Sequence, residues 1–597
     1  VIAKGVENAV DIGSGANGTT TGANTFTGGS IGLVNQSIAP IPSNGTGRVA
    51  CVTVSDLTPN APVMIEGLDG YGVNDIVADD YGAIHLWLPD GTYHFTANGK
   101  ECSVRIKNGV GPSGVSVNGE EAVFGPDDPG AGWDYDATTC TLWLMGAGPF
   151  TLSGANESGN VRVVVSNDVV STVTLSNLTL RATGADQCVF ALEENANVSL
   201  VLAGANTLAS GENCAGLEVA AGRTLAVTNA PGNATASLAA TGGWNGAGIG
   251  GGKNAGGGTI MLAGGRITAT SSYQGAGIGG GYQGAGGTVT IDGGVIVANG
   301  GSSGAGIGGG YEGAGGTVAV SDGTVTARGG YYAAGIGGGS SGAGGTTTIS
   351  GGSVTAIGGG YAAGIGGGSG KAGGNVTISG GTVAATGGYR AAGIGGGDGK
   401  AGGNATISGG RVTATGGSSG GAGIGGGSGP NGVGGSVAVS GGTVAAQGTD
   451  GGADIGPGLD GMSSGANTFT GGSIGLAASA IALAPSNGTA RVGYIVESGF
   501  TPGDPVTIEG LGDYGVHDIF ADAGGAIHLW LPDGTYNFTA NGRSCTAKIK
   551  NGSGPIGVTI NGEDVAFTPD DPAAAGWNYD SAPGILSLTG AGPFTLS

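Results

Sequence analysis

Charged residues, histidine and long apolar runs are scarce in this sequence, and each shortage excludes a class of protein. Asp, Glu, Lys and Arg make up 10% of the 597 residues, and the formal net charge is −23. An acidic chain argues against nucleic acid as a partner, because binding to phosphates needs Lys and Arg. No run of 18 apolar residues occurs, so the sequence predicts no membrane span. None of the four histidines lies in the glycine-rich centre of the chain.

Glycine is abundant instead, with 143 residues, and it recurs at an even spacing. The phrase Gly-Ile-Gly-Gly-Gly returns seven times between positions 248 and 427, and a weaker copy surrounds Ile455. The step is about 29 residues, and a nearly constant step of this length marks a repeat architecture. The absence of a Gly-X-Y period excludes collagen. The isoleucines of the seven copies are Ile249, Ile278, Ile307, Ile336, Ile365, Ile394 and Ile424.

Each repeat contains three short β-type runs separated by glycine pairs, as in residues 333–361. Three strands and three turns in about 29 residues describe one coil of a parallel β-helix. Apolar residues alternate with Thr or Asn in the second run, which is the pattern of a strand with one buried face. The sequence therefore predicts an all-β fold built on a three-faced, right-handed parallel β-helix. The predicted inward residues include Leu262, Ile291, Val320, Ile349, Ile378, Ile407 and Val439 in the second run and Ile267, Ile296, Val325, Val354, Val383 and Val412 in the third.

A second, longer repeat organises the whole chain. Residues 24–153 recur as 467–597, so that "IHLWLPDGTYHFTANGK" at 84–100 returns as "IHLWLPDGTYNFTANGR" at 527–543. Because the first and last residues match parts of the solenoid, we expect a fragment of a longer tandem protein. The predicted order is the tail of a preceding β-helix (1–23), a small β-sandwich module (24–125), a cap at the start of the β-helix (126–155), the parallel β-helix (156–460), a second β-sandwich module (461–568) and the cap of the next β-helix (569–597).

Two stretches resemble known bacterial surface proteins. The segment "ADAGGAIHLWLPDGTYNFTANG" resembles the prealbumin-like repeats of adhesins and pilus proteins. The segment 197–228, followed by the "GAGIGGG" coils, resembles glycine-rich parallel β-helix proteins of bacterial surfaces, many of which are labelled carbohydrate-binding by similarity. The resemblance implies a location outside the cell or on its surface.

Aromatic residues recur at fixed places in the coils. Some lie five or four residues before the coil isoleucine, and others lie four residues after it. Stacked coils would align them in columns along one edge. Such columns can bind sugar rings or contact a neighbouring rod, or they can stack on one another and cover glycine-rich backbone. The residues are Trp244, Tyr273, Tyr282, Tyr311, Tyr331, Tyr332, Tyr361 and Tyr389.

Two cysteines predict a disulfide. Cys188 and Cys214 occupy like places in successive coils, and stacking would bring them within bonding range. This bond fits an extracellular compartment. The pairing of Cys51, Cys102, Cys140 and Cys545 stays open.

An acidic cluster at the start of the β-helix is the weak candidate for a metal site. Its carboxylates could hold Ca²⁺ and stiffen the joint, or they could belong to a solvated acidic linker. No other cofactor is predicted. The acids are Asp127, Asp128, Asp134 and Asp136.

The predicted function is structural and not enzymatic. Glycoside hydrolysis needs paired carboxylates, and the five acids of residues 241–450 fall at different points of the coil. We therefore expect an extracellular repeat protein that forms a stalk, surface fibre or matrix filament and is adhesive, with itself as partner. The alternative is a carbohydrate-binding adhesin that uses the aromatic columns. A polysaccharide-active enzyme ranks third, and an ice-binding role for the outward threonines ranks last.

Overall fold

In the computed structural model the described residues form β-strands joined by turns and loops. The structure describes residues 114–461 apart from 127, 129, 137–138, 157–160 and 183, together with shorter segments between 2 and 106 and between 467 and 588. Among these residues the one helical segment is a short 3-10 turn, Ala122–Phe124. No helix in the described part of the chain is long and apolar enough to cross a membrane. The chain divides into two compact units, Val1–Val164 and Val165–Ser597.

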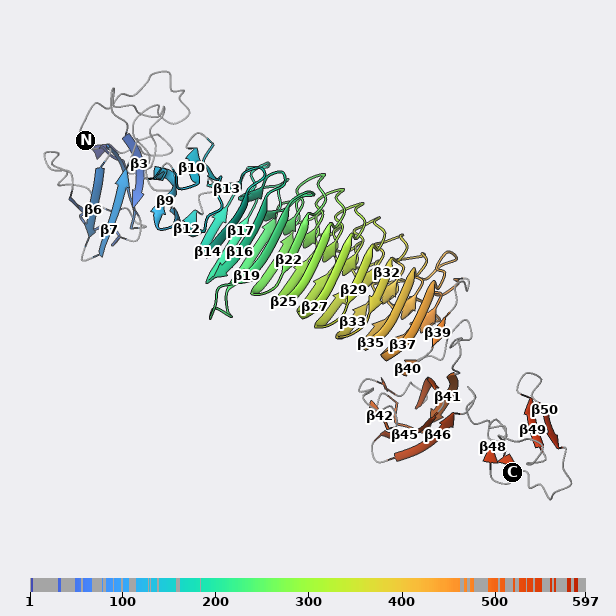
Figure 1. The fold of residues 1–597 in the computed structure, drawn as a ribbon. Helices are drawn as coiled ribbons and strands as arrows, with labels where there is room; N and C mark the ends of the chain where they lie inside the picture. Colours follow the sequence, from blue (N-terminus) through green and yellow to red (C-terminus); the bar gives the residue numbers. More distant parts are fainter. Residues whose placement is uncertain are drawn as a thin grey trace. The chain divides into compact units, whose positions relative to one another are not determined.

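The second unit contains a parallel β-solenoid. A typical coil consists of β28 (Ile336–Gly337), β29 (Thr346–Ile349) and β30 (Ser353–Ile357). Each strand pairs in parallel with its equivalent in the next coil, and the successive strands lie side by side in Figure 1. In this register Ile336 lies beside Ile365. The prediction of an all-β parallel β-helix with coils of about 29 residues is confirmed.

The first strand of each coil is short and occurs ten times in this unit. The ten strands are β15 (Phe190–Leu192), β18 (Leu217–Glu218), β21 (Ile249–Gly250), β24 (Ile278–Gly279), β26 (Ile307–Gly308), β28, β31 (Ile365–Gly366), β34 (Ile394–Gly395), β36 (Ile424–Gly425) and β38 (Ile455–Gly456).

The second and third runs belong to one sheet. They form separate strands in some coils, but in others the glycine corner between them is part of a single long strand. The sequence predicts a turn at every such corner. In the structure β25 and β27 each run through this corner as one long strand. They stay paired across it, with a shift of register after Ile291. The strands are β14 (Val170–Arg181), β16 (Asn197–Ala203), β17 (Ala205–Ala209), β19 (Thr224–Asn229), β20 (Ser237–Gly242), β22 (Thr259–Leu262), β23 (Arg266–Ser271), β25 (Thr288–Asn299), β27 (Thr317–Arg328), β29, β30, β32 (Asn375–Ile378), β33 (Thr382–Thr386), β35 (Asn404–Thr415) and β37 (Ser436–Gln447).

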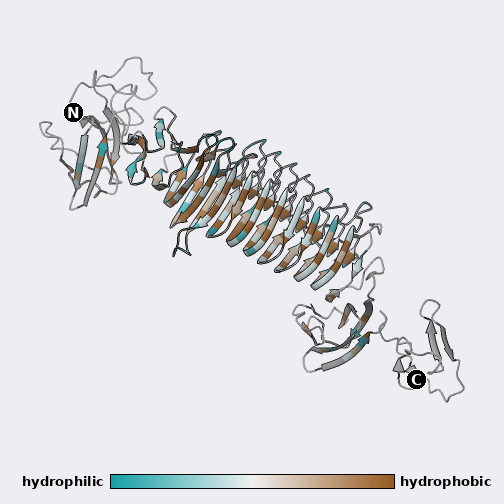
Figure 2. Cartoon of the chain, viewed as in Figure 1, coloured by the Kyte–Doolittle hydropathy of each residue, from teal (hydrophilic) through white to brown (hydrophobic). Residues whose placement is uncertain are grey.

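The core of the solenoid is a set of apolar columns. Every residue predicted to point inward from the second and third runs is buried, as are the isoleucines of the first strands. Brown bands of apolar residues follow the strands in Figure 2. Full burial of one such side chain is worth about 1.5–3 kcal/mol, so the columns supply the main driving force for stacking. Thr347 interrupts one column and is itself buried.

Glycine allows the coils to approach closely beside this core. In each first strand from β21 on, the residue after the isoleucine is a glycine with φ between +133° and +146°. A Cβ on Gly308 would overlap the carbonyl oxygen of Gly337 in the next coil. The isoleucine therefore fills the interior, while the following glycine provides the close backbone contact. This column explains why the phrase keeps its glycines at every turn.

The first unit contains two small sheets that share one cluster of buried side chains. One sheet holds the antiparallel strands β2 (Ile31–Leu33), β3 (Val49–Val54) and β5 (Ile84–Pro89), and β1 (Ile2–Ala3) joins its edge in parallel with β2. The other holds β4 (Met64–Glu66), β6 (Gly91–Ala97) and β7 (Lys100–Ile106). Val54 and Ile84 from the first sheet join Phe95 and Val104 from the second in the same core. The remaining strands of the unit are β8 (Val115–Val117), β9 (Glu120–Glu121), β10 (Trp133–Asp136), β11 (Thr141–Leu144), β12 (Phe150–Asn156) and β13 (Arg162–Val165).

The second copy of the module repeats these pairings. β44 (Ala526–Pro532) pairs with β40 (Ser473–Leu476) and β41 (Val492–Ser498), and β45 (Gly534–Ala540) lies between β42 (Pro505–Glu509) and β46 (Arg543–Ile549). β40 also pairs in parallel with β37 of the last coils. The other strands are β39 (Thr468–Phe469), β43 (Ile519–Phe520), β47 (Thr559–Ile560), β48 (Glu563–Asp564), β49 (Trp577–Asp580) and β50 (Ile585–Leu588).

The close coil contact gives a stability prediction. Gly308→Ala places a methyl group against the Gly337 carbonyl in a backbone conformation that alanine disfavours, so we expect a loss of about 2–4 kcal/mol. Gly370→Ala is the control, because Gly370 has φ +66° and nothing lies within 4 Å of its added Cβ, and its expected cost is about 1 kcal/mol. Thermal unfolding followed by circular dichroism ranks the two variants. Equal midpoints would contradict the close contact.

Candidate functional site

The eight predicted aromatic residues lie on one edge of the solenoid, which we call the aromatic edge. The backbone N–H of Tyr282 donates to the carbonyl oxygen of Asn245 in the preceding coil at 2.8 Å, and Tyr311 donates in the same way to Gln274 at 2.9 Å. The residue four places after the isoleucine of one coil therefore lies against the residue four places before the isoleucine of the preceding coil. The predicted columns merge into one strip.

The rings of the aromatic edge form three groups, of which two are simple stacked pairs. Trp244 and Tyr273 have ring centroids 4.2 Å apart and planes inclined by 27°. Tyr282 and Tyr311 have centroids 5.5 Å apart and planes inclined by 2°. In such stacks each ring covers a face of its neighbour. In each pair one face of a ring is turned to its neighbour, and Trp244 is still 50% exposed.

The third group is a cluster of four tyrosines. Tyr332 and Tyr361 are nearly parallel, with planes inclined by 11° and centroids 6.1 Å apart. Tyr331 meets Tyr332 at 88° and Tyr361 at 78°, and Tyr389 meets Tyr361 at 83°. Edge-to-face contacts of this kind are favourable pairings for aromatic rings. Two ring orientations therefore alternate along this part of the edge.

Tyr331 lies over the backbone of Gly360 in the next coil. Three adjacent ring atoms lie 2.8, 3.0 and 3.1 Å from the place a Cβ of Gly360 would take, so the glycine meets the face of the ring and not its rim. Gly360 occupies the same place in its coil as Tyr331 and Tyr389 do in theirs. Tyr331 is 53% exposed and Tyr389 is 46% exposed. These two tyrosines are the most exposed members of the cluster.

Neighbouring polar groups raise the pKa of two phenols on the edge. A hydrogen bond with the Tyr331 side chain is the largest cause of the raised pKa of Tyr361. The carboxylate of Glu312 raises the pKa of Tyr311, because a negative charge disfavours the phenolate. Gln283 donates from Nε2 to Glu312 Oε2 at 3.0 Å and so orients that carboxylate. Both phenols stay neutral at physiological pH.

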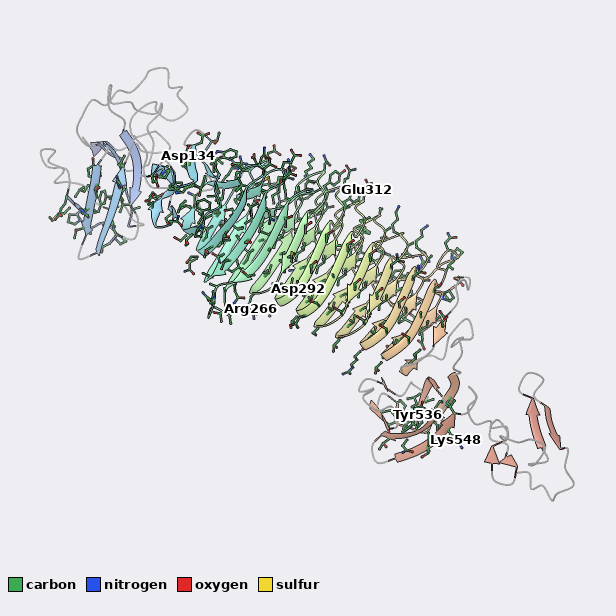
Figure 3. The ribbon with its side chains drawn as sticks, viewed as in Figure 1. Asp134, Arg266, Asp292, Glu312, Tyr536 and Lys548 are labelled. Atoms are coloured by element: carbon green, nitrogen blue, oxygen red, sulfur yellow. A yellow bond between two sulfur atoms is a disulfide. The ribbon has the colours of Figure 1, made fainter. Side chains whose placement is uncertain are left out.

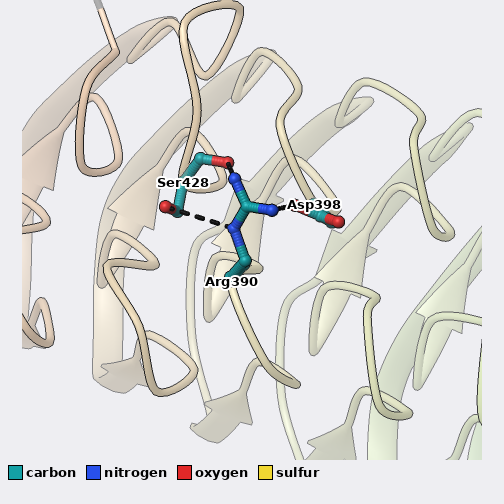
Figure 4. Close-up of polar contacts among 3 residues, drawn as sticks. All are labelled: Arg390, Asp398 and Ser428. Carbon is teal, nitrogen blue, oxygen red and sulfur yellow. Dashed lines mark hydrogen bonds and ion pairs between the residues drawn. The ribbon is translucent and has the colours of Figure 1, made fainter.

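An ion pair follows the tyrosine cluster along the edge. Arg390 Nη1 lies 3.3 Å from Asp398 Oδ1, and Arg390 Nη2 donates to the backbone oxygen of Ser428 at 3.1 Å (Figure 4). Arg390 has the place in its coil that Tyr361 has in the coil before. The pairing balances the charge of Arg390 beside the tyrosine cluster. The sequence alone did not predict this ion pair, although the same alignment of columns places its two members on the aromatic edge.

Of the five acids of the central coils, the register of β25 and β27 brings two side by side, Asp292 and Asp322, although the sequence placed them at different points of the coil. Figure 3 shows Glu312 at one edge of the solenoid and Asp292, with Arg266, at the opposite edge. Asp292 accepts a hydrogen bond from Ser321 Oγ at 2.6 Å, and Asp398 pairs with Arg390. These contacts engage the two acids in links between parts of the coil stack.

The predicted calcium ligands bind local donors where they are described. Asp127 lies outside the described residues. Asp128 Oδ1 accepts from the N–H of Gly130, Asp134 Oδ1 from the N–H of Tyr135, and Asp136 Oδ2 from the hydroxyl of Thr139, each at 2.8 Å. The calcium site stays a prediction.

The two cysteines of the first coils are joined. Cys188 and Cys214 form a disulfide with their Cα atoms 5.1 Å apart, and both are buried. The Oε2 atom of Glu218 lies 2.9 Å from Cys188 Sγ. Sequence reasoning missed this carboxylate because the strand register pairs Ala191 with Glu218, which is one residue out of step with the cysteines. Cys140 is a half-buried thiol beside Tyr135, and the side chains of Cys51, Cys102 and Cys545 lie outside the described residues.

The comparisons with known proteins agree with the fold. Six segments match the model of the Beta helix repeat family, at residues 257–282, 289–311, 315–340, 348–369, 376–398 and 406–428. All six lie in the regular glycine-rich coils. No curated protein and no solved structure matches the chain. Because β-helix repeats occur in polysaccharide-active enzymes and in structural proteins, the match identifies the repeat and leaves the activity to the surface residues.

The hydrogen bond between the Tyr331 and Tyr361 side chains predicts that the Tyr361 phenol ionises at a higher pH than an ordinary tyrosine. The raised pKa of Tyr361 means that this contact stabilises the fold at and below pH 10, and that the stabilisation is lost as pH rises through the raised value. Tyr331→Phe keeps the ring and removes the hydroxyl, so we expect the pKa of Tyr361 to fall towards 10. Phenolate absorbance of the Tyr331→Phe chain measures the change, with Tyr273→Phe as the control. An unchanged titration would show that the hydroxyl contact is absent.

Proposed function

We propose that the chain is an extracellular structural repeat protein in which rigid β-solenoid rods alternate with small β modules to form a stalk, surface fibre or matrix filament. Each coil of the solenoid satisfies the backbone N–H and C=O groups of its neighbours, so length is added by repetition. The apolar core columns continue from coil to coil, with Thr347 as an interruption of one column. The proposed role needs no catalytic group.

The observation that carries the proposal is the repetition of one joint. In the second module, Ala445 of β37 pairs with Gly475, and Ala446 pairs with Leu476. In the first module, Ile2↔Gly32 and Ala3↔Leu33 are the equivalent pairs of the longer repeat. Residues 2–3 therefore meet the first module as the last coils meet the second. A unit that repeats both rod and joint supports a thread-like assembly.

An extracellular location is part of the proposal. The Cys188–Cys214 disulfide supports it, because such bonds persist in oxidising compartments and are rare in reducing ones. The resemblance of the module and the coils to bacterial surface proteins supports the same location. The partner proposed for the rod is a second copy of the chain, since like surfaces on identical units build filaments when the contact does not close.

Electron microscopy of the purified chain tests the structural role. The ten stacked first strands predict a rod of about 45–50 Å at the usual strand spacing. We expect elongated rods that join into fibres as concentration rises, and sedimentation measures that association. Single rods at every concentration would reject the filament and retain the stalk. Compact, featureless particles would reject both.

The exposed ring faces favour a second function, the binding of a neutral glycan. Tyr331 has one face on Gly360, and it is 53% exposed. Tyr389 occupies the same column two coils on, about 9.6 Å away at the usual spacing. Two platforms held at that distance by a rigid rod could stack on alternate rings of an extended sugar chain. The paired Arg390 leaves the charge there balanced, which suits an uncharged ligand.

Paired substitutions separate this function from the structural one. Tyr331→Ala with Tyr389→Ala removes both platforms, and at about 0.5–1.5 kcal/mol per ring we expect glycan retention to weaken about tenfold. Tyr282→Ala with Tyr311→Ala is the matched control, because those rings stack on each other, are half-buried and lie outside the tyrosine cluster, so their loss should leave binding unchanged. Glycan arrays and affinity electrophoresis provide the measurement. Equal losses in the two variants, or no loss in either, would leave the tyrosines with a structural role alone.

A further inference from the structure

The disulfide in the first coils has a third potential ligand beside it. Within the described part of the chain, three ligand atoms of His, Cys, Asp or Glu come within 4.8 Å of one another at one place, formed by Cys188, Cys214 and Glu218. Cys188 is 8% exposed and Cys214 is 4% exposed. Glu218 is half-buried, with its Oε2 atom 2.9 Å from Cys188 Sγ. Two sulfurs and a carboxylate oxygen are a donor set that Zn²⁺ accepts.

Strand pairing positions Glu218, and a backbone hydrogen bond positions the segment that carries Cys188. Glu218 ends β18, whose Leu217 pairs with Ile249 and points into the core, so Glu218 points out of the core on the side of the sulfurs. Its successor in the column is Gly250, which has no side chain to compete for the space. The N–H of Val189, next to Cys188, is fixed by the Ser210 hydroxyl at 3.0 Å. Glu218 therefore stands on a paired strand, whereas the two cysteines lie in the segments that precede the first strands of their coils.

The charge of this end of the solenoid favours a cation. Residues 165–252 contain six carboxylates and two arginines, whereas residues 253–450 contain five carboxylates and seven basic residues. The two arginines of the first segment are Arg181 and Arg223. A divalent cation would therefore neutralise a local excess of negative charge.

We propose that reduction of the Cys188–Cys214 disulfide opens a zinc site made of the two thiolates and the Glu218 carboxylate. A dithiol or phosphine reductant supplies two electrons to the S–S bond, and two protons complete the thiols while the reductant is oxidised. Zn²⁺ then takes an electron pair from each sulfur and displaces the two protons to solvent. Glu218 supplies the third ligand, and water fills the fourth position. The site is thus closed to metal in the oxidised chain and open in the reduced one.

The test uses the full chain with Cys51, Cys102, Cys140 and Cys545 changed to Ser, so that the pair is the only source of thiol. The chain is reduced with a phosphine, freed of reductant without oxygen, and titrated with Zn²⁺ against a chromophoric chelator. We expect one zinc per reduced chain and none in the oxidised chain. Co²⁺ in place of Zn²⁺ should give a thiolate charge-transfer band.

Two substitutions distinguish this site from general binding by thiols or acids. Glu218→Gln should weaken zinc binding at least about tenfold, as loss of a supporting group around a metal does. Glu212→Gln is the matched control, since Glu212 is exposed and stands two residues before Cys214 outside the three-ligand group, and it should leave binding unchanged. Equal binding by the oxidised chain, or no effect of Glu218→Gln, would overturn the proposal.

Circular dichroism shows whether the solenoid survives reduction. An intact spectrum without bound zinc overturns the proposal directly. If the reduced chain loses its fold, zinc should restore it when Glu218 is present and fail to do so in the Glu218→Gln variant. A reduced chain that zinc does not refold overturns the proposal as well.

Discussion

The close approach of one coil to the next is the constraint on which the rest of this structure depends. Hydrogen bonds between parallel strands fix the coil spacing, and at that spacing the backbone after each buried isoleucine leaves no space for a side chain. From β21 on, glycine at this position is therefore a condition for the close approach, whereas Ala191 and Glu218 take the equivalent places in β15 and β18. Apolar burial stabilises the stack from within, but it could not do so if the carbonyl oxygen of Gly337 met a methyl group at position 308.

A fixed register also decides the chemistry of the surface. Because equivalent residues stack, any side chain that recurs in the repeat becomes a line along the rod, and a change in one coil becomes a break in that line. The aromatic edge illustrates this rule. Along this edge the rings make stacked and edge-to-face contacts. Arg390 then stands where the preceding coil has Tyr361, and there an ion pair with Asp398 replaces the ring contact. The outward face of the second strand follows the same rule, with Thr at position 346 followed by Asn at 375 and 404.

The sequence predicted those features that depend on period alone. The constant step between the isoleucines predicted the coil, and the alternation in each run predicted which residues face the core, including Ile349 and Val354. Period could not predict features that depend on the path of the loops. The interleaving of residues before and after the first strand needs the backbone bond from Tyr282 to Asn245, which no spacing reveals. The contact of Glu218 with Cys188 could not be predicted for a similar reason. The paired strand residues Ala191 and Glu218 are one residue further apart in sequence than the bonded cysteines, and this difference brings the carboxylate beside the sulfur.

The same rigidity connects the structural and the binding roles of the edge. A tyrosine on a mobile loop loses side-chain and backbone freedom when it binds, and that loss subtracts from affinity. Tyr331 already lies with one face on the backbone of Gly360, and it makes edge-to-face contacts with Tyr332 and Tyr361. The exposed part of its ring is therefore presented in a fixed position. Rings that are held against the coils become a preorganised surface where they stay exposed, whereas Tyr282 and Tyr311 stack on each other and are half-buried.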